Sequence, residues 1–160
     1  MTNLDWSWID LVQLLAAAAV GLLIGYQREL NFKPAGITTM TIVTVTSTLL
    51  MQLSIRLSAL GAGPITADPT RLAAAVITGI GFLGAGVIIQ TGRQVHGITT
   101  ASTIWLMTGI GLAIGAGYYH PAAAAVLIVW AVLAADPYTE RVIAARRERL
   151  RRRHGGKVEE

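Results

Sequence analysis

Long runs of uncharged residues alternate with short charged segments along the 160-residue chain. Four uncharged runs stand out, at residues 11–27, 34–55, 72–92 and 94–135. A helix that crosses a bilayer needs roughly 17–25 apolar residues, so each of the first three runs suffices for one crossing. The fourth is long enough for two, because residues 115–121 (GAGYYHP) supply a turn between them.

The pattern therefore predicts an all-α integral membrane protein with five transmembrane helices. We place these helices at roughly residues 8–27, 37–56, 72–91, 99–116 and 120–136. Residues 1–136 form the predicted transmembrane domain, and residues 137–160 form a basic cytoplasmic tail. Asp136 and Pro137 have the chemistry of the cap and first position of a short helix that lies along the membrane surface.

Lys and Arg are distributed unequally between the two sides of the membrane. Eleven of the 13 lie on one predicted side, and the other side holds Arg56 and Arg71. Short loops rich in these residues stay in the cytoplasm, so we expect the N-terminus outside and the C-terminus inside. The basic tail could bind nucleic acid, but a topological anchor is its ordinary role. We therefore expect membrane lipids, and no nucleic acid, as partners.

Glycines are concentrated within the predicted spans, where they let neighbouring backbones approach closely. Four lie in the third span, and they fall on two sides of the helix, which predicts that this span is clasped between two others. Further glycines recur every four residues in the first and fourth spans. The predicted packing positions are Gly21, Gly25, Gly79, Gly81, Gly84, Gly86, Gly111 and Gly115. Their partners could belong to this chain or to another.

The third-span glycines also match the dinucleotide-binding pattern G-x-G-x-x-G. That pattern requires a preceding strand, a following helix and an acidic residue about 20 positions further on. None of these is present in the sequence. No cofactor is predicted.

A short segment recurs within the chain. Residues 36–41 (GITTMT) resemble residues 97–102 (GITTAS), and the same offset of 61 places Gly25 on Gly86. Two crossings separate the copies, so they would share one orientation, as in transporters with parallel repeats. This pattern predicts a two-helix repeat, helices 1–2 and 3–4, plus a fifth helix. Chance similarity of a short Gly/Thr string is the alternative.

The cytoplasmic face carries the candidate interaction residues. Two predicted helices begin there, where unpaired amides and positive dipole ends meet nearby threonines and basic side chains. Such a face suits an anion, a lipid headgroup or an acidic partner, although the threonines could simply cap the helices. The candidates are Arg28, Glu29, Gly36, Thr39, Arg93, Gly97 and Thr100.

Residues suited to catalysis or metal binding are scarce. The chain has no cysteine, and within the spans Asp10 lies at the membrane rim with no second carboxylate nearby. Because Mg²⁺ and Ca²⁺ sites need several oxygens including carboxylates, we expect no metal site and no divalent-cation permeation. No nucleophile, base or paired-carboxylate constellation is present, so an enzyme is not predicted.

Thr41, Thr44 and Thr48 fall on one face of the second predicted span. Their hydroxyls could coordinate a monovalent ion, which makes a small channel or transporter the alternative function. Hydroxyls in membrane helices more often bond back to the preceding turn. In that case the threonines would have no role in transport.

Five segments of this sequence resemble the MgtC/SapB family. They are residues 21–29, 34–39, 71–74, 78–89 and 95–105, and the resemblance extends over roughly residues 10–135. It implies a non-enzymatic, multi-pass protein of the bacterial inner membrane, linked to magnesium limitation and to survival inside host cells. It also implies action by binding other membrane proteins, notably the proton-translocating ATP synthase.

The sequence departs from that family in two respects. Gln27 stands where members commonly have an acidic residue, which removes one possible cation ligand. Many members also continue into a soluble cytoplasmic domain of the ACT type, whereas this sequence ends at Glu160. A function that depends on such a domain is therefore not predicted from these residues.

Overall fold

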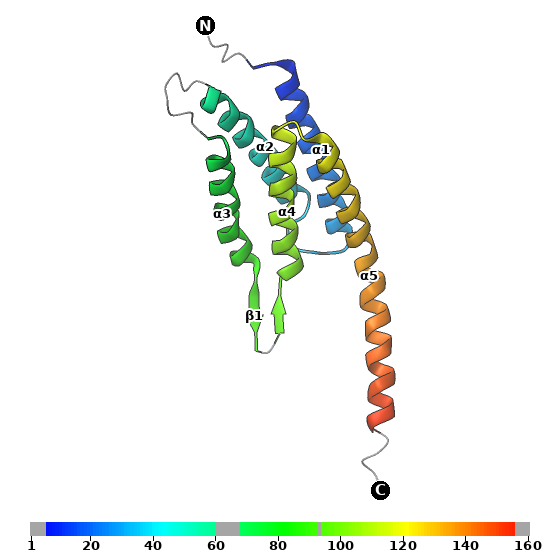
Figure 1. Cartoon of the computed structure of the whole chain (residues 1–160). Coiled ribbons are helices and arrows are strands. Elements are labelled where there is room, and N and C mark those ends of the chain that lie inside the picture. The colour runs from blue at the N-terminus through cyan, green and yellow to red at the C-terminus, as the bar shows by residue number, and fades with distance from the viewer. Residues whose placement is uncertain (1–5, 60–67, 93, 156–160) are drawn as a thin grey trace.

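The computed structural model describes residues 6–59, 68–92 and 94–155. Five helices in it are long and apolar enough to cross a membrane, which confirms the predicted fold class. The elements in chain order are α1 (Trp8–Leu30), α2 (Ile37–Ala59), α3 (Thr70–Val87), β1 (Ile89–Thr91), β2 (Gln94–His96), α4 (Ile98–Gly115) and α5 (Tyr119–Gly155). In Figure 1 the start of α1 and the end of α5 lie at opposite ends of the molecule.

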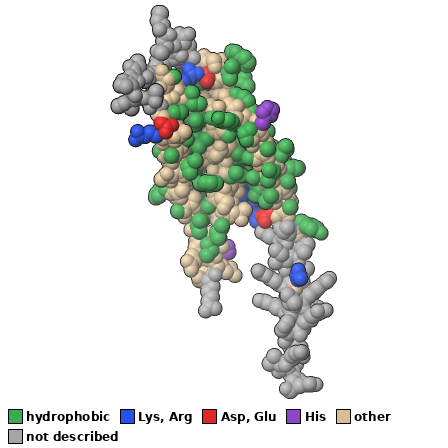
Figure 2. Space-filling model, viewed as in Figure 1, with side chains coloured by type: hydrophobic (Ala, Val, Ile, Leu, Met, Phe, Trp, Pro, Cys, Tyr) green, Lys and Arg blue, Asp and Glu red, His purple; other side chains and the backbone are tan. Residues whose placement is uncertain are grey.

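The helices form a bundle with α2 at its centre (Figure 1). α2 packs most extensively against α1 and α4, while α3 lies at the edge of the bundle against α4. α5 makes smaller contacts with α4 and α1. Figure 2 shows apolar and uncharged side chains over the middle of the visible face, with charged groups nearer the ends. This distribution suits a bundle surrounded by lipid.

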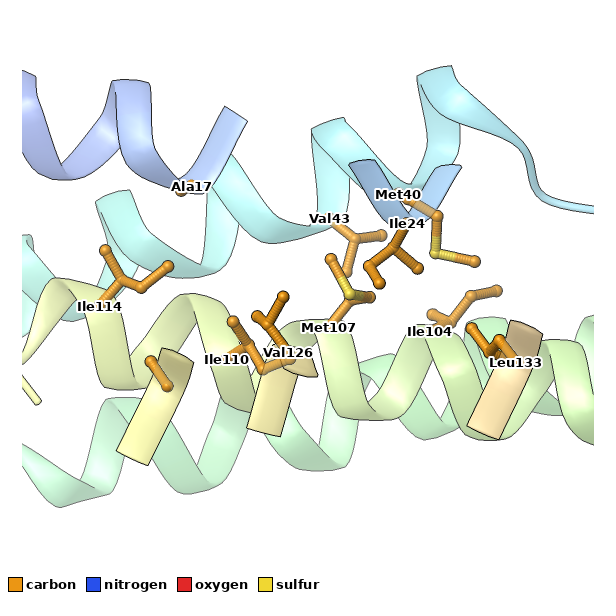
Figure 3. Packing of buried hydrophobic residues seen from close by; sticks show 11 residues of the cluster. Ala17, Ile24, Met40, Val43, Ile104, Met107, Ile110, Ile114, Val126 and Leu133 are labelled. Atoms are coloured by element: carbon orange, nitrogen blue, oxygen red, sulfur yellow. The ribbon is translucent and has the colours of Figure 1, made fainter. Parts of the chain in front are cut away.

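A row of interlocking apolar side chains fills the space between α1, α2, α4 and α5 (Figure 3). Ile24 of α1, Met40 of α2 and Met107 of α4 are fully buried there. Unbranched methionines adapt to irregular gaps between helices. The row includes Ala17, Ile24, Met40, Val43, Ile104, Met107, Ile110, Ile114, Val126 and Leu133.

Two glycine pairs bring α2 close to its neighbours. A Cβ on Gly21 or Gly25 of α1 would lie 2.5 Å from the Cα of Thr41 or Ile37. A Cβ on Gly111 of α4 would lie 2.5 Å from the carbonyl oxygen of Thr44. Gly115 has the same relation, also at 2.5 Å, to the carbonyl of Thr48 one turn further along. In these two helices, glycine is the residue that permits the observed helix spacing.

The glycines of α3 have a different environment, and this corrects the prediction that α3 is clasped between two helices. Gly84 is the one buried residue of α3, whose residues are all described, and its Cβ would meet the Cβ of Ala101 at 3.7 Å. Among the described residues, nothing lies within 4 Å of a Cβ at Gly79, Gly81 or Gly86. α3 contacts α4 and, less extensively, α2, and its other faces are exposed.

A β-hairpin replaces the predicted last turn of the third span. α3 ends at Val87, and β1 pairs with β2 in antiparallel register, with Gln90 opposite Val95. β-branched residues favour strands, and Gly92 provides the positive φ of 62° at the tip. The charge pattern did not indicate this change, because β1 belongs to the same uncharged run as α3.

One further expectation is corrected, and another is not confirmed. α5 continues without a break through Asp136 and Pro137, so no separate tail helix begins there. A proline removes one backbone hydrogen bond, and the helix formers on both sides evidently outweigh that cost. The two-helix repeat is not confirmed. A Cβ on Gly25 would meet α2, whereas no described atom lies within 4 Å of a Cβ on its counterpart Gly86.

Candidate functional site

Arg28 is the centre of a buried polar site at the end of the bundle that holds the α1–α2 turn (residues 31–36) and the hairpin. We call this the inner end, because it is predicted to face the cytoplasm. The side chain of Arg28 is 2% exposed. It donates to the hydroxyls of Thr100 at 2.7 Å and Thr103 at 3.2 Å, both on α4. It also donates to the carbonyls of Pro34 at 2.7 Å and Ala35 at 3.1 Å.

The local backbone places these groups together. The carbonyl of Arg28 accepts bonds from the amides of Asn31 and Lys33, both at 3.1 Å, which closes the end of α1. α4 begins directly after Gly97, so Thr100 and Thr103 lie in its first two turns facing Arg28. Four of the five guanidinium N–H groups can thus be assigned to neutral oxygens, so this site joins three segments and leaves Arg28 little capacity for an outside anion.

An ion pair attaches α5 to the same end. Lys33 of the α1–α2 turn lies 3.2 Å from the carboxylate of Asp136. The two side chains are each about one-third exposed, so water screens their attraction. This pair lies where α5 leaves the apolar part of the bundle.

The predicted inner-face residues divide into buried and exposed groups. Arg28 and Thr100 are buried against each other and present no surface. Glu29 and Thr39 are exposed, and the Glu29 carboxylate accepts a bond of 3.3 Å from the amide of Ile37. A Cβ on Gly36 would lie 2.9 Å from that carboxylate. Sequence reasoning placed these residues on the correct segments but did not predict which side chains turn inward.

The other two predicted inner-face residues belong to the hairpin region. Gly97 has a φ of 87°, and a Cβ there would collide with the carbonyl of Val87. Glycine is required because the chain passes directly over the end of α3. Arg93 lies outside the described residues.

A second polar cluster lies at the opposite, outer end. Asp10 of α1 pairs with Arg56 of α2. Gln52 of α2 donates from its amide nitrogen to Gln13 at 2.7 Å, and Gln13 donates to the hydroxyl of Tyr119 at 2.8 Å. The sequence indicated that four of these residues lie near the outer membrane boundary, but not that they meet. Two features of the sequence could have predicted the contact: these residues lie at a similar depth in the membrane, and Asp10 and Arg56 carry opposite charges.

The threonine face of α2 packs against protein. Thr44 and Thr48 are fully buried, and each hydroxyl donates to a carbonyl four residues earlier, at 2.7 Å and 3.0 Å. Thr48 also contacts the carbonyl of Gly111 at 2.9 Å, across the α2–α4 interface. The Thr41 hydroxyl is buried and has no partner among the described residues. The hydroxyls of Thr44 and Thr48 are therefore engaged with backbone carbonyls inside the bundle.

A groove runs along the exposed side of α4, between α3 and α5. Its α3–α4 part encloses about 610 Å³ and its α4–α5 part about 180 Å³. Trp105 lines both parts. The floor is formed by Ala101, Ser102, Trp105, Gly109 and Ala113. We call this surface the α4 groove.

The α4 groove has uncharged walls. Gly81 and Ala85 of α3 line one side, and Pro121 and Ala125 of α5 line the other. From Ala101 to Ala113 the floor is about 18 Å long, at 1.5 Å per helical residue. Within the part of the chain that the structure describes, no group of His, Cys, Asp or Glu could hold a metal ion.

These features define a multi-pass α-helical membrane protein with an uncharged groove on its lipid-facing side. Comparison with known sequences gives a more specific identification. The chain belongs to the MgtC family, whose sequence profile matches residues 14–142.

Individual relatives agree with this assignment. The chain is 42% identical to the protein named SapB of Bacillus subtilis, over 79% of this chain and 56% of that protein. It is 39% identical to the protein named MgtC of Salmonella typhimurium, over 74% of this chain and 48% of that protein. An uncharacterized protein of Haemophilus influenzae is 40% identical, over 87% and 60% respectively. The chain thus spans about half the length of these relatives. No solved structure matches it.

Proposed function

We propose that this chain is a non-enzymatic protein of the bacterial inner membrane that acts by binding another membrane protein through the α4 groove. In this proposal the N-terminus lies outside and the C-terminus in the cytoplasm. The occupant of the groove is an uncharged transmembrane helix, because the walls offer apolar surface and no charge. A second copy of this chain and an unrelated membrane protein are the two possible sources of that helix.

The observation that carries the proposal is the contrast between the glycines. Gly21, Gly25, Gly111 and Gly115 each face a neighbouring backbone, as expected for helix packing in lipid. Gly81 and Gly109 line the α4 groove and have no described neighbour within 4 Å of a Cβ. Glycine lowers helix stability by about 1 kcal/mol relative to alanine. A partner helix at the groove would give these glycines the same role as the other four.

The biological setting follows from the family. The MgtC/SapB resemblance implies adaptation to magnesium limitation, and it implies the proton-translocating ATP synthase as a partner. We therefore propose the membrane helices of that enzyme as one candidate occupant of the α4 groove. No second function is proposed, because Thr44 and Thr48, which the channel alternative needed, are buried between α2 and α4.

Substitution of Gly109 by leucine tests the proposal. A leucine there fills the groove floor without meeting any described atom at its Cβ, so the bundle itself is expected to fold. Gly81→Leu blocks the facing wall in the same way. Ala19→Leu, on the exposed side of α1, adds the same bulk away from the groove and is the matched control.

The measurement is co-purification of membrane proteins after crosslinking in cells. We expect Gly109→Leu and Gly81→Leu to lose a complex that wild type and Ala19→Leu retain, with unchanged helical content and thermal midpoint in detergent. Mass spectrometry of the complex then separates a second copy from an ATP synthase subunit or another protein. A complex that survives both groove substitutions would refute the proposal.

A further inference from the structure

Phe32, in the α1–α2 turn, combines a rare backbone conformation with a highly exposed side chain. Its φ is +52°, a left-handed conformation that bulky residues rarely adopt. Its side chain is 95% exposed, the highest value among the large apolar residues described. Helices usually end on such a left-handed residue, but glycine or asparagine normally fills the position. Local backbone preference therefore does not explain a phenylalanine here.

The turn is held firmly in this shape. The amide of Phe32 donates to the carbonyl of Glu29 at 3.0 Å, and the amide of Lys33 donates to the carbonyl of Arg28 at 3.1 Å. The buried Arg28 side chain fixes the far side of the turn through the carbonyls of Pro34 and Ala35. Ala35 is also left-handed, with a φ of +58°. Strained residues persist only where the surroundings determine them, and they cluster at functional positions.

The position of Phe32 relative to the bilayer follows from α1. A stripe of exposed apolar residues runs along this helix, formed by Leu11, Leu15, Leu22, Tyr26 and Leu30. From Trp8 to Leu30 the helix rises about 33 Å, close to the roughly 30 Å thickness of the hydrocarbon region. The stripe therefore ends near the inner boundary of that region. Phe32 follows two residues later, so the length of α1 places it at the level of the lipid headgroups.

We infer that Phe32 is a lipid anchor, inserted at the boundary between headgroups and acyl chains of the inner leaflet. An aromatic ring is favoured at this depth, whereas the same ring would be unfavourable in open water. The Arg28 hydrogen bonds act as the rigid support that directs the ring outward. The lipid surface is the occupant we choose, because Phe32 directly follows the exposed apolar stripe of α1 in the chain and is itself exposed. This inference does not depend on a partner in the α4 groove.

A nitroxide label measures the depth directly. The chain has no cysteine, so Phe32→Cys gives a unique labelling site. The labelled protein is reconstituted in vesicles of phosphatidylethanolamine and phosphatidylglycerol, and collisions with oxygen and with a water-soluble nickel chelate are compared. Leu15→Cys serves as the lipid-exposed control, and Arg146→Cys, on the exposed part of α5 beyond the spans, serves as the aqueous control.

We expect the label at position 32 to be more accessible to oxygen than to the chelate, like the label at Leu15 and unlike that at Arg146. A nickel accessibility equal to that of Arg146 places the residue in water and overturns the inference. Low accessibility to both reagents indicates a protein contact and also overturns it.

A second variant provides a check in case the nitroxide label disturbs the fold. Phe32→Trp keeps an aromatic ring, and its fluorescence is obtained as the difference from wild type. We expect loss of that difference signal with lipids brominated near the carbonyl, and no quenching by aqueous iodide. Quenching by iodide instead would contradict the assignment independently of the label.

Discussion

Arg28 is the residue on which the inner end of the bundle depends most. Its four hydrogen bonds connect α1, the α1–α2 turn and α4, and each acceptor is a neutral oxygen. Hydrogen bonds offset the free-energy cost of burying a charged donor, and Arg28 makes four of them. The residue therefore acts as a structural connection between helices, although the sequence alone suggested a surface role.

Replacement of Arg28 by methionine tests this role. Methionine keeps an unbranched, flexible side chain, although a shorter one, and removes four hydrogen bonds, each contributing about 1 kcal/mol. We expect the free energy of unfolding in detergent to fall by roughly 2–4 kcal/mol, measured by circular dichroism with denaturant. Arg71→Met, at an exposed position of α3, is the control and should change stability little. An equal effect of the two substitutions would show that Arg28 does not support the fold.

Gly111 and Gly109, both on α4, allow the effect of a closely packed glycine to be compared with that of an open one. A Cβ on Gly111 would lie 2.5 Å from the carbonyl of Thr44, whereas a Cβ on Gly109 meets no described atom within 4 Å. We expect Gly111→Leu to abolish recovery of monodisperse protein, because a side chain there overpacks the α2–α4 interface. Gly109→Leu should be recovered normally. Size-exclusion chromatography gives the comparison, and similar profiles would contradict the packing described.

At the scale of helices, the outer polar cluster fixes how α1, α2 and α5 meet. The Asp10–Arg56 pair and the Gln13–Gln52 bond both join α1 to α2, while Tyr119 adds the start of α5. Polar contacts of this kind fix the register between helices in an apolar environment. Together with the Arg28 site, they hold the bundle at both ends.

A double-mutant cycle on Asp10 and Arg56 tests whether this pair couples the two helices. We expect Asp10→Asn and Arg56→Gln each to lower stability, and the double variant to lower it by less than the sum. The coupling energy should be about 1–2 kcal/mol, since the pair is only partly exposed. Chemical denaturation in detergent measures it. Strict additivity would mean that the ion pair contributes nothing to the α1–α2 contact.

The sequence predicted the helices well and the contacts between them poorly. Long uncharged runs determine which segments can cross a bilayer, so α1, α2, α4 and α5 begin within one residue of the predicted positions. The hairpin after Val87 was missed because hydropathy does not distinguish strand from helix in a continuous apolar run. The burial of Arg28 was missed because its partners Thr100 and Thr103 lie 72 and 75 positions away.

For the whole molecule, five crossings require the two termini to lie on opposite sides of the membrane. The Lys and Arg distribution predicts that α1 begins outside and that α5 ends in the cytoplasm. Single cysteines at Ser7 and Arg146, added to a chain that has none, test this topology. We expect an impermeant maleimide to label position 7 in cells whose inner membrane is intact, and position 146 only after that membrane is permeabilised. Labelling of both in intact cells would contradict five crossings.

The molecule combines a closely packed centre with an open edge. α2 is enclosed by α1 and α4, with glycines at each contact, whereas α3 has one buried residue and borders the α4 groove. A helix with so little internal packing contributes little to the stability of the chain by itself. In our account, a transmembrane helix of another protein molecule packs against the glycine faces of α3 and into the α4 groove.

Photocrosslinking in living cells tests that claim most directly. A photoreactive amino acid replaces Trp105, which lines both parts of the α4 groove, and in a separate variant it replaces Leu15 on the exposed side of α1. Our account predicts a protein adduct from position 105 that disappears when Gly109→Leu is added, and lipid adducts alone from position 15. Lipid adducts alone from both positions, or an adduct at 105 that Gly109→Leu leaves unchanged, would contradict it.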